Sequence, residues 1–158
     1  MTAAEELTRI AVEADALHAR SRALLVGAAR KGAAAGMSQR EIAAAIGRSQ
    51  PEVSRLLHFQ PSTPRGHLLM LHRDAVITVL RSHDLINPRV VGSVARGTDG
   101  PDSDIDLLVD AKTPVSLFQI ARAESEVSDI LGCTVELVIA DQLRLHVRAR
   151  MEAEAARL

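Results

Sequence analysis

The 158-residue sequence has a single cysteine, no tryptophan, no tyrosine and only two phenylalanines. The lone cysteine, Cys133, excludes an internal disulfide and is typical of a protein in a reducing compartment, where it serves as a small buried apolar residue. With so few aromatic rings for a nucleotide base to stack on, we expect weak base discrimination. The sequence contains no signal peptide and no long apolar span, so we expect a soluble cytoplasmic protein without membrane contact.

Net charge is also nearly absent, because 19 lysine and arginine residues face 20 aspartate and glutamate residues. This balance alone favours neither a nucleic-acid binder nor a membrane-surface protein. The basic residues are unevenly distributed, however: between His18 and His58 there are seven, against only two glutamates. With 47% hydrophobic residues a real core can form. The sequence therefore predicts a globular protein with a basic N-terminal part and a more acidic C-terminal part.

The first 31 residues are rich in alanine, glutamate, leucine and arginine, which are good helix formers. Gly27 leaves open whether they form one helix or two. The apolar residues of this segment fall at roughly helical spacing. These residues contact either a partner helix, as in a dimer, or other residues of their own domain. The spacing is compatible with both. They are Leu7, Ile10, Ala14, Leu17, Leu24 and Leu25.

Two short helices with clear start signals come next. Ser38, followed three residues later by Glu41, has the pattern of a capping box. Gly47 marks a helix end, and Ser49 caps the following helix, which has Pro51 in its first turn. The predicted helices span about residues 39–45 and 50–58.

Residues 36–57 resemble the bipartite helix-turn-helix of bacterial repressors of the phage-repressor type, in which the second helix enters the major groove. The resemblance implies operator DNA as a partner. Such repressors usually dimerise on half-sites about 34 Å apart, so we expect a homodimer. The alternative is a helical hairpin that only packs against the rest of the protein. The residues expected to contact DNA are Gln39, Arg40, Arg48, Ser49, Gln50, Ser54 and Arg55.

A segment with two prolines among small polar residues, 60–66, indicates a boundary, so we predict domains 1–60 and 61–158. Beyond it, predicted helices and strands follow in an order that indicates an α/β (α+β) domain with a small mixed sheet. The predicted elements are a helix from Pro64 to about His83, a turn at Asn87-Pro88, a strand ending at Val90-Val91, a strand at 105–109, a helix capped by Thr113 and running from about 115 to 131, a strand at 133–139 and a helix from about 142 to 156.

The stretch from Val90 to Asp110 combines features of a phosphate site and a metal site. Gly92 allows a sharp backbone turn, and Ser93 offers a hydroxyl and an N–H at the start of a predicted short helix. Asp104 and Asp106 are two residues apart at the start of a strand, so their carboxylates share a face. Like charges this close repel, and a divalent cation such as Mg²⁺ would relieve that repulsion.

The linked pattern Gly-Ser-x-x-Arg-Gly at 92–97 and Ser-Asp-x-Asp-Leu-Leu-Val at 103–109 resembles the signature of the polymerase-β-type nucleotidyltransferase superfamily. Over residues 64–158 the chain is most similar to the minimal nucleotidyltransferases (MNT) of prokaryotes. The resemblance implies a polymerase-β-like fold and two Mg²⁺ ions held by Asp104 and Asp106, with Glu136 as a third, catalytic carboxylate. Glu136 departs from the aspartate that is common in this group, and it reaches about one bond further.

The resemblance also implies that ATP or another nucleoside triphosphate is the substrate. The residues expected to bind it are Gly92, Ser93, Arg96 and Ser103. For Arg96, packing against the acidic loop is the alternative to phosphate binding.

MNT proteins are commonly antitoxins paired with HEPN-type ribonuclease toxins, and some transfer AMP from ATP to a toxin tyrosine. The resemblance therefore implies nucleotide transfer to a protein hydroxyl, a toxin partner and repression of the protein's own operon through the helix-turn-helix. Two alternatives stay open. One is a transcriptional regulator whose nucleotidyltransferase domain is catalytically weak and senses a nucleotide, and the other is a transferase that modifies a small molecule such as an antibiotic.

Overall fold

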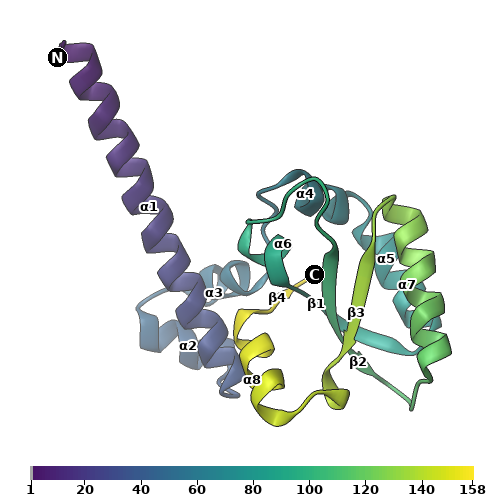
Figure 1. The fold of residues 1–158 in the computed structure, drawn as a ribbon. Coiled ribbons are helices and arrows are strands. Elements are labelled where there is room, and N and C mark those ends of the chain that lie inside the picture. The colour runs from purple at the N-terminus through teal and green to yellow at the C-terminus, as the bar shows by residue number, and fades with distance from the viewer. Residues whose placement is uncertain (1) are drawn as a thin grey trace. The chain divides into compact units, whose positions relative to one another are not determined.

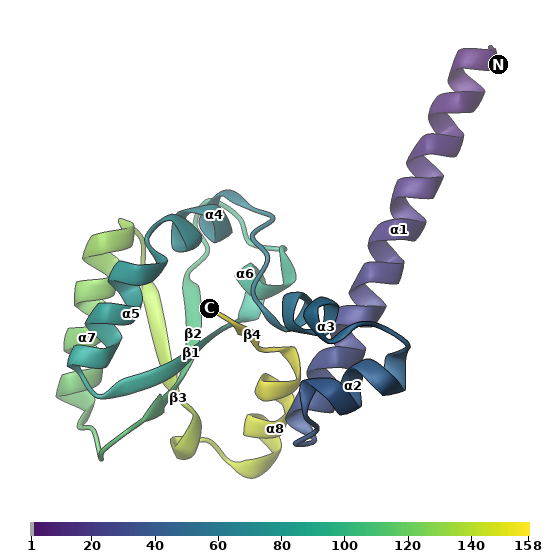
Figure 2. The same cartoon turned by 180° about the vertical axis from the view of Figure 1, so that it is seen from behind.

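The computed structural model describes residues 2–158, and the chain divides into two compact units, Met1–Leu56 and Leu57–Leu158. Figures 1 and 2 show the elements of both units from opposite sides. None of the helices within residues 2–158 combines the length and apolar character needed to cross a membrane.

The N-terminal unit is formed by α1 (Ala3–Ala34), α2 (Gln39–Ile46) and α3 (Gln50–Leu57). α1 is one uninterrupted helix of 32 residues, so Gly27 does not break it. It begins with a capping box made by Thr2 and Glu5. Near its C-terminal end α1 packs closely on α2, because a Cβ placed at Gly32 would lie only 2.8 Å from Ile42 Cγ1. A larger residue at this position would push the two helices apart.

The start signals predicted for α2 and α3 are confirmed. Ser38 and Glu41 exchange the two hydrogen bonds of a capping box. Ser49 N donates to Glu52 Oε2 at 3.0 Å, and Glu52 N donates to Ser49 Oγ at 3.4 Å. The hydrogen bonds from the two serines lower the pKa of each glutamate, so both carboxylates are held ionised. Gly47 ends α2 at φ 64°, ψ 41°, a left-handed conformation that favours glycine.

The C-terminal unit opens with α4 (Pro64–Leu71) and α5 (Arg73–Ser82). The prediction of one continuous helix from Pro64 to about His83 is therefore wrong. The chain breaks at His72, which has φ −104° and ψ 14° and connects the two helices. Neither glycine nor proline marks this position, so the sequence carries no local sign of the break.

A mixed four-stranded sheet follows, as predicted. Its strands are β1 (Leu85–Val91), β2 (Ile105–Ala111), β3 (Val135–Ile139) and β4 (Ala156–Arg157). They lie in the order β3-β2-β1-β4, with β1 antiparallel to β2 and β4, and β2 parallel to β3. The short helix α6 (Gly92–Arg96) connects to the end of β1, as the sequence indicated.

The predicted turn at Asn87-Pro88 is wrong, because both residues lie within β1. Asn87 adopts a φ of 51°, and the pairing register with β2 shifts between Ile86 and Arg89. This irregularity accommodates the turn-forming residues inside the strand, since asparagine tolerates a positive φ better than most residues.

Two helix boundaries also differ from the prediction. α7 (Leu117–Leu131) is capped by Ser116, whose side chain accepts a hydrogen bond from Gln119 N. The Thr113 hydroxyl instead donates a hydrogen bond to Asp84 Oδ2 at 3.1 Å, which links the loop before α7 to the turn after α5. Both residues are plausible caps in sequence, and the contact with a distant aspartate decides between them.

The predicted final helix from 142 to 156 is shorter and starts later. A turn of 3₁₀ helix, η1 (Ala140–Gln142), precedes α8 (Leu145–Glu154), and the chain then forms β4. Ala156 pairs with Val90, and Leu158 N donates to Pro88 O at 3.0 Å. Sheet pairing of the last residues thus replaces the final helical turn.

The two faces of the sheet have different coverings (Figures 1 and 2). On one face, Ile105, Leu107 and Val109 of β2 join the main core with residues of α5 and α7. On the other, Leu108 of β2 belongs to a smaller cluster that includes Met151 of α8. Because side chains alternate along a strand, Asp106 lies on the same face as Leu108.

Candidate active site

The predicted catalytic carboxylates meet at the start of β2. Asp106 is the second residue of that strand, and its Cα partner on β3 is Glu136. On the other side its partner is Val91 of β1, the residue before Gly92. Asp104 is exposed and lies just before the strand. The sheet topology therefore gathers residues that are far apart in the sequence.

The electrostatics of this group centre on Asp106. Its pKa is raised above the ordinary value, chiefly by burial and then by the negative charges of Glu136 and Asp104. The positive charge of Arg96 acts in the opposite direction. Asp106 is thus a half-buried carboxyl whose ionisation is less favourable than usual, and a bound cation would favour its charged form.

Within residues 2–158, no three histidine, cysteine, aspartate or glutamate side chains are close enough, as they stand, to enclose a metal ion. Asp104 and Glu136 are nevertheless both close enough to raise the pKa of Asp106. Carboxylate oxygens are the protein ligands that Mg²⁺ takes. The residues present therefore fit Mg²⁺ in type and charge. Direct ligation needs a rotamer change of Asp104 and Glu136, which exposed side chains make readily.

The position of Asp106 requires a glycine at residue 92. Gly92 has a φ of 71°, and a Cβ built on it would overlap Asp106 Oδ2. Any other residue there would combine backbone strain with a collision against the carboxylate. The absent side chain thus allows the turn after β1 to approach Asp106 directly.

The two predicted phosphate-binding serines differ in their contacts. The Ser93 carbonyl accepts a hydrogen bond from Thr98 N at 3.0 Å, while its hydroxyl has no partner in the described chain. The Ser103 hydroxyl accepts a hydrogen bond from Gly100 N at 2.8 Å, and Ser103 N donates to Gly100 O at 3.1 Å. Ser93 therefore offers its hydroxyl to a ligand, whereas Ser103 shapes the acidic loop before Asp104.

The sequence did not reveal two residues that support this loop and helix, Glu154 and Arg65. Glu154 of α8 forms an ion pair with the predicted Arg96, with 3.3 Å between Oε2 and Nη1. Arg65 of α4 donates a hydrogen bond to the carbonyl oxygen of Pro101. Both contacts join segments that are distant in sequence, so no motif could have revealed them.

The three arginines predicted to contact DNA lie on the exposed surface of the N-terminal unit. Arg40 is near the start of α2, Arg48 lies in the turn, and Arg55 is in the second half of α3. Arg48 Nη1 donates to Gly47 O at 3.0 Å, which holds its side chain along the turn. The α2–turn–α3 segment therefore presents cations at three points.

The predicted polar DNA contacts also make bonds within the segment. The Ser49 hydroxyl donates to Glu52 Oε2 at 2.7 Å, and Gln50 Nε2 donates to Gln39 Oε1 at 2.5 Å. Gln39 and Ser54 are half-buried, whereas Ser49 and Gln50 are exposed. The Gln50–Gln39 bond joins the first residues of α3 and α2.

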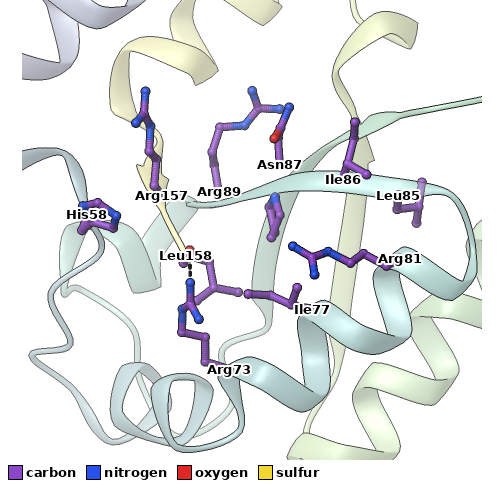
Figure 3. Close-up of a pocket in the computed structure, with 11 residues that line it drawn as sticks. His58, Arg73, Ile77, Arg81, Leu85, Ile86, Asn87, Arg89, Arg157 and Leu158 are labelled. Carbon is purple, nitrogen blue, oxygen red and sulfur yellow. Dashed lines mark hydrogen bonds between the residues drawn. The ribbon is translucent and has the colours of Figure 1, made fainter. Parts of the chain in front are cut away.

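A pocket of about 720 Å³ lies at the other end of β1, where β4 leaves that strand uncovered (Figure 3). Within residues 2–158, no aspartate or glutamate lines it, and its basic residues are His58, Arg73, Arg81, Arg89 and Arg157. Two of these arginines form ion pairs with aspartates. Arg73 Nη1 lies 2.8 Å from Asp74 Oδ1, and Arg89 Nη2 lies 2.7 Å from Asp110 Oδ1. None of the residues predicted from the sequence lines this pocket.

Asp110, the partner of Arg89, shows how that ion pair is maintained. Burial acts to raise its pKa, but hydrogen bonds from Asn87 and Arg89 outweigh burial, so the pKa of Asp110 is lowered. The carboxylate stays ionised and holds Arg89 in place at neutral pH.

Residues 75–158 match the family model described as "Nucleotidyltransferase domain", which is more than half of the chain. The chain belongs to this nucleotidyltransferase family. The matched region contains all three carboxylates, Gly92 and Ser93. The predicted α+β nucleotidyltransferase fold with its small mixed sheet is thereby confirmed.

Two proteins of Methanocaldococcus jannaschii, both named "Putative protein adenylyltransferase", are similar to this nucleotidyltransferase. One is 41% identical over 49 residues, which are 31% of this chain and 50% of that protein. The other is 29% identical over 80 residues, which are 51% of this chain and 86% of that protein. The match thus spans half the length of the first relative and most of the second.

A solved structure described as a "putative minimal nucleotidyltransferase" is also similar. It is 35% identical in sequence, with a TM-score of 0.54, and the alignment covers 58% of this chain and 94% of that one. The likeness covers nearly all of the smaller protein, so the additional residues of this nucleotidyltransferase lie outside the shared fold.

Proposed function

We propose that the C-terminal unit transfers a nucleotide from ATP or another nucleoside triphosphate to a hydroxyl group of a protein. The observation that carries the proposal is the pairing of Asp106 with Glu136 across β2 and β3, next to Asp104. The charges of Glu136 and Asp104 help to raise the pKa of Asp106, so a bound cation would relieve the repulsion among the three carboxylates. Membership of the nucleotidyltransferase family supports the same reaction.

The residues of this chain have distinct tasks in such a transfer. Asp104 and Asp106 would hold two Mg²⁺ ions, with Glu136 on the catalytic one. Bound Mg²⁺ would neutralise phosphate charge and lower the pKa of the acceptor hydroxyl. Gly92 lets the triphosphate approach the backbone, and the Ser93 hydroxyl donates to a phosphate oxygen. The acceptor oxygen then bonds to the α-phosphorus as the bond to pyrophosphate breaks.

Arg96 and Ser103 act on the same substrate in different ways. Arg96 is held at the site by Glu154 and offers its charge to the phosphates. Ser103 acts through the loop that it closes with Gly100, which positions Asp104. Catalysis would rest mainly on positioning and charge neutralisation.

A protein acceptor is favoured by the names of the two relatives from Methanocaldococcus jannaschii. The resemblance to MNT antitoxins supports a HEPN-type toxin as that acceptor, with this chain as the antitoxin. A small-molecule acceptor and a nucleotide-sensing regulator are the alternatives. Transfer to the product of the neighbouring gene would favour the toxin as acceptor, and no transfer would favour one of the two alternatives.

For the N-terminal unit we propose operator binding and repression of the protein's own operon as a homodimer. The two eight-residue helices joined at Gly47 support this, as do the exposed Arg40, Arg48 and Arg55. Replacing Gln50 and Arg55 by alanine should abolish the gel shift of the promoter and leave nucleotide transfer unchanged. Normal promoter binding by that double variant would show that the unit does not recognise DNA through α3.

The transferase is tested with labelled ATP, Mg²⁺ and the neighbouring gene's product. Asp104→Asn and Asp106→Asn should each abolish label transfer, because each removes a ligand charge. Asp102→Asn is the matched control, since Asp102 is exposed in the same loop. Full transfer by Asp106→Asn would sink the proposal, and so would equal losses in all three variants.

A further inference from the structure

The first helix presents a long row of apolar side chains to solvent. Every residue of α1 from Ala3 to Leu24 is exposed, and Ala29 is the buried residue of the helix. The exposed fractions on one stripe are 68% for Leu7, 50% for Ile10, 61% for Leu17 and 68% for Leu24. Large apolar residues gathered in this way mark an interaction surface.

The spacing of the stripe identifies the kind of surface. Its positions alternate steps of three and four residues, which is the heptad pattern of paired helices. A helix that packs into its own domain usually shows a broader apolar face, whereas this stripe has two positions per seven residues. The six positions in order are Leu7, Ile10, Ala14, Leu17, Ser21 and Leu24.

We propose that α1 pairs with the α1 of a second copy of this chain, that the two helices run antiparallel, and that this pair is the dimer interface. The proposal does not depend on the transferase activity. It gives the homodimer of the proposed repressor a defined contact.

Residue size favours the antiparallel direction. In an antiparallel pair, the small residues of the stripe face large ones: Leu17 meets the partner's Ala14, and Ile10 meets the partner's Ser21. The four central layers therefore each combine one large and one small residue, and Leu7 faces the partner's Leu24 in the layer at either end. In a parallel pair Ala14 would face the partner's Ala14, and Leu17 would face the partner's Leu17, so thin and thick layers would alternate.

Charge favours the same direction. In the antiparallel pair Glu13 lies beside the partner's Arg20, and the symmetry of the pair repeats this contact once. Arg20 has no hydrogen bond or ion pair within residues 2–158, and Glu13 has only an exposed contact of 3.6 Å with Arg9. In a parallel pair Glu13 would face the partner's His18, so its contact with Arg20 would be lost. Opposite charges beside the stripe thus help to fix direction and register.

The arrangement has a consequence for DNA binding. α2 packs on the C-terminal end of α1, and an antiparallel pair puts the two C-terminal ends at opposite ends of the interface. With a rise of 1.5 Å per residue these ends are roughly 50 Å apart. That exceeds the separation of about 34 Å for adjacent half-sites. An operator recognised by this dimer should therefore have half-sites more than one helical turn apart.

The interface is tested by measuring the mass of the full chain in solution by sedimentation over a range of concentrations. The parent should have twice the 17.0 kDa of one chain at micromolar concentration. Leu17→Glu should weaken the dimer by on the order of 100-fold or more, since both copies lose an apolar contact. Val12→Glu is the matched control, because Val12 is 63% exposed but lies off the stripe. Circular dichroism checks that both variants keep their helices.

A monomeric parent at all concentrations would overturn the proposal. Equal weakening by Val12→Glu and Leu17→Glu would overturn it too, since the stripe would then have no special role.

The direction of the pair is tested by disulfide cross-linking in a Cys133→Ser background. When chains carrying Leu7→Cys and Leu24→Cys are mixed, the antiparallel pair brings the two thiols together and they should cross-link across the interface. Neither variant should cross-link with itself, because like residues are then about 25 Å apart along the pair. Efficient self-cross-linking of each variant would show a parallel pair and contradict the proposed geometry.

Discussion

The sheet of the C-terminal unit and the first helix treat their apolar residues in opposite ways. Leu107 at the centre of β2 is fully buried, whereas Leu17 in α1 is 61% exposed. Packing on α5 and α7 stabilises β2, so this part of the fold is complete within one chain. α1 has regular spacing and a good cap but little packing of its own, and a helix gains most of its stability from packing. The difference agrees with the proposed roles, namely catalysis by the sheet unit and association through the helix.

The largest expected effect comes from applying one substitution to both regions. Leu107→Ala should lower the free energy of unfolding of the sheet by about 3 kcal/mol, because it leaves a cavity in a packed core. Leu17→Ala should change the free energy of unfolding of the sheet by less than about 0.5 kcal/mol, because Leu17 belongs to the other unit and is exposed within its own chain. Hydrogen exchange of the β2 amides measures both changes in the free energy of unfolding. It does not need tryptophan or tyrosine fluorescence, and the chain has neither residue. Similar losses would mean that α1 packs on the sheet unit.

A smaller effect is expected at the turn beside Asp106. Gly92→Ala should lower stability by roughly 1–2 kcal/mol through its left-handed backbone, with a further loss from overlap with Asp106. Gly132→Ala is the matched control, because Gly132 has a φ of 66° and a Cβ added there would have nothing within 4 Å. Only Gly92→Ala should also abolish nucleotide transfer. Equal stability losses in the two variants would remove the argument that Gly92 is required by Asp106.

The smallest effect concerns the charge of Asp106 itself. The pKa of Asp106 is higher in the folded than in the unfolded protein. At a pH above both pKa values, ionisation of Asp106 therefore lowers the stability of the folded state. This loss disappears as the pH falls to the pKa that Asp106 has in the unfolded chain. Without metal, Asp106→Asn should therefore raise the melting temperature near neutral pH by about 2 °C, and the gain should vanish in acid. Calorimetry at several pH values, with Asp102→Asn as control, measures this. A gain that grew as pH fell would contradict the raised pKa.

Local signals in the sequence predicted much of the fold. The serine–glutamate pairs at 38/41 and 49/52 fixed the starts of α2 and α3, since a capping box is complete within four residues. The apolar run at 105–109 became the buried part of β2. The break at His72 and the strand position of Asn87 were not predictable, because tertiary packing rather than local preference produces them.

The candidate site likewise contains residues that the sequence predicted and residues that only the fold reveals. The spacing of Asp104 and Asp106 predicted a shared face, and the strand order made Glu136 a neighbour. Arg65 and Glu154 support the loop and α6 from distant segments, so they emerge only from the fold. The sequence motif thus contains the predicted catalytic carboxylates Asp104 and Asp106, but it does not contain the supporting residues Arg65 and Glu154.

The most direct measurement is the rate of Mg²⁺-dependent transfer of labelled nucleotide by variants of Glu136. If Glu136 acts with Asp106 across β2 and β3, Glu136→Gln should lower the rate by about 100-fold or more, since it removes a ligand charge at the metal. Glu136→Asp should be much milder, because it keeps the carboxylate and shortens its reach. A Glu136→Gln protein that transfers nucleotide at the parent rate would contradict the account, since the carboxylate pair would then not be the reaction site.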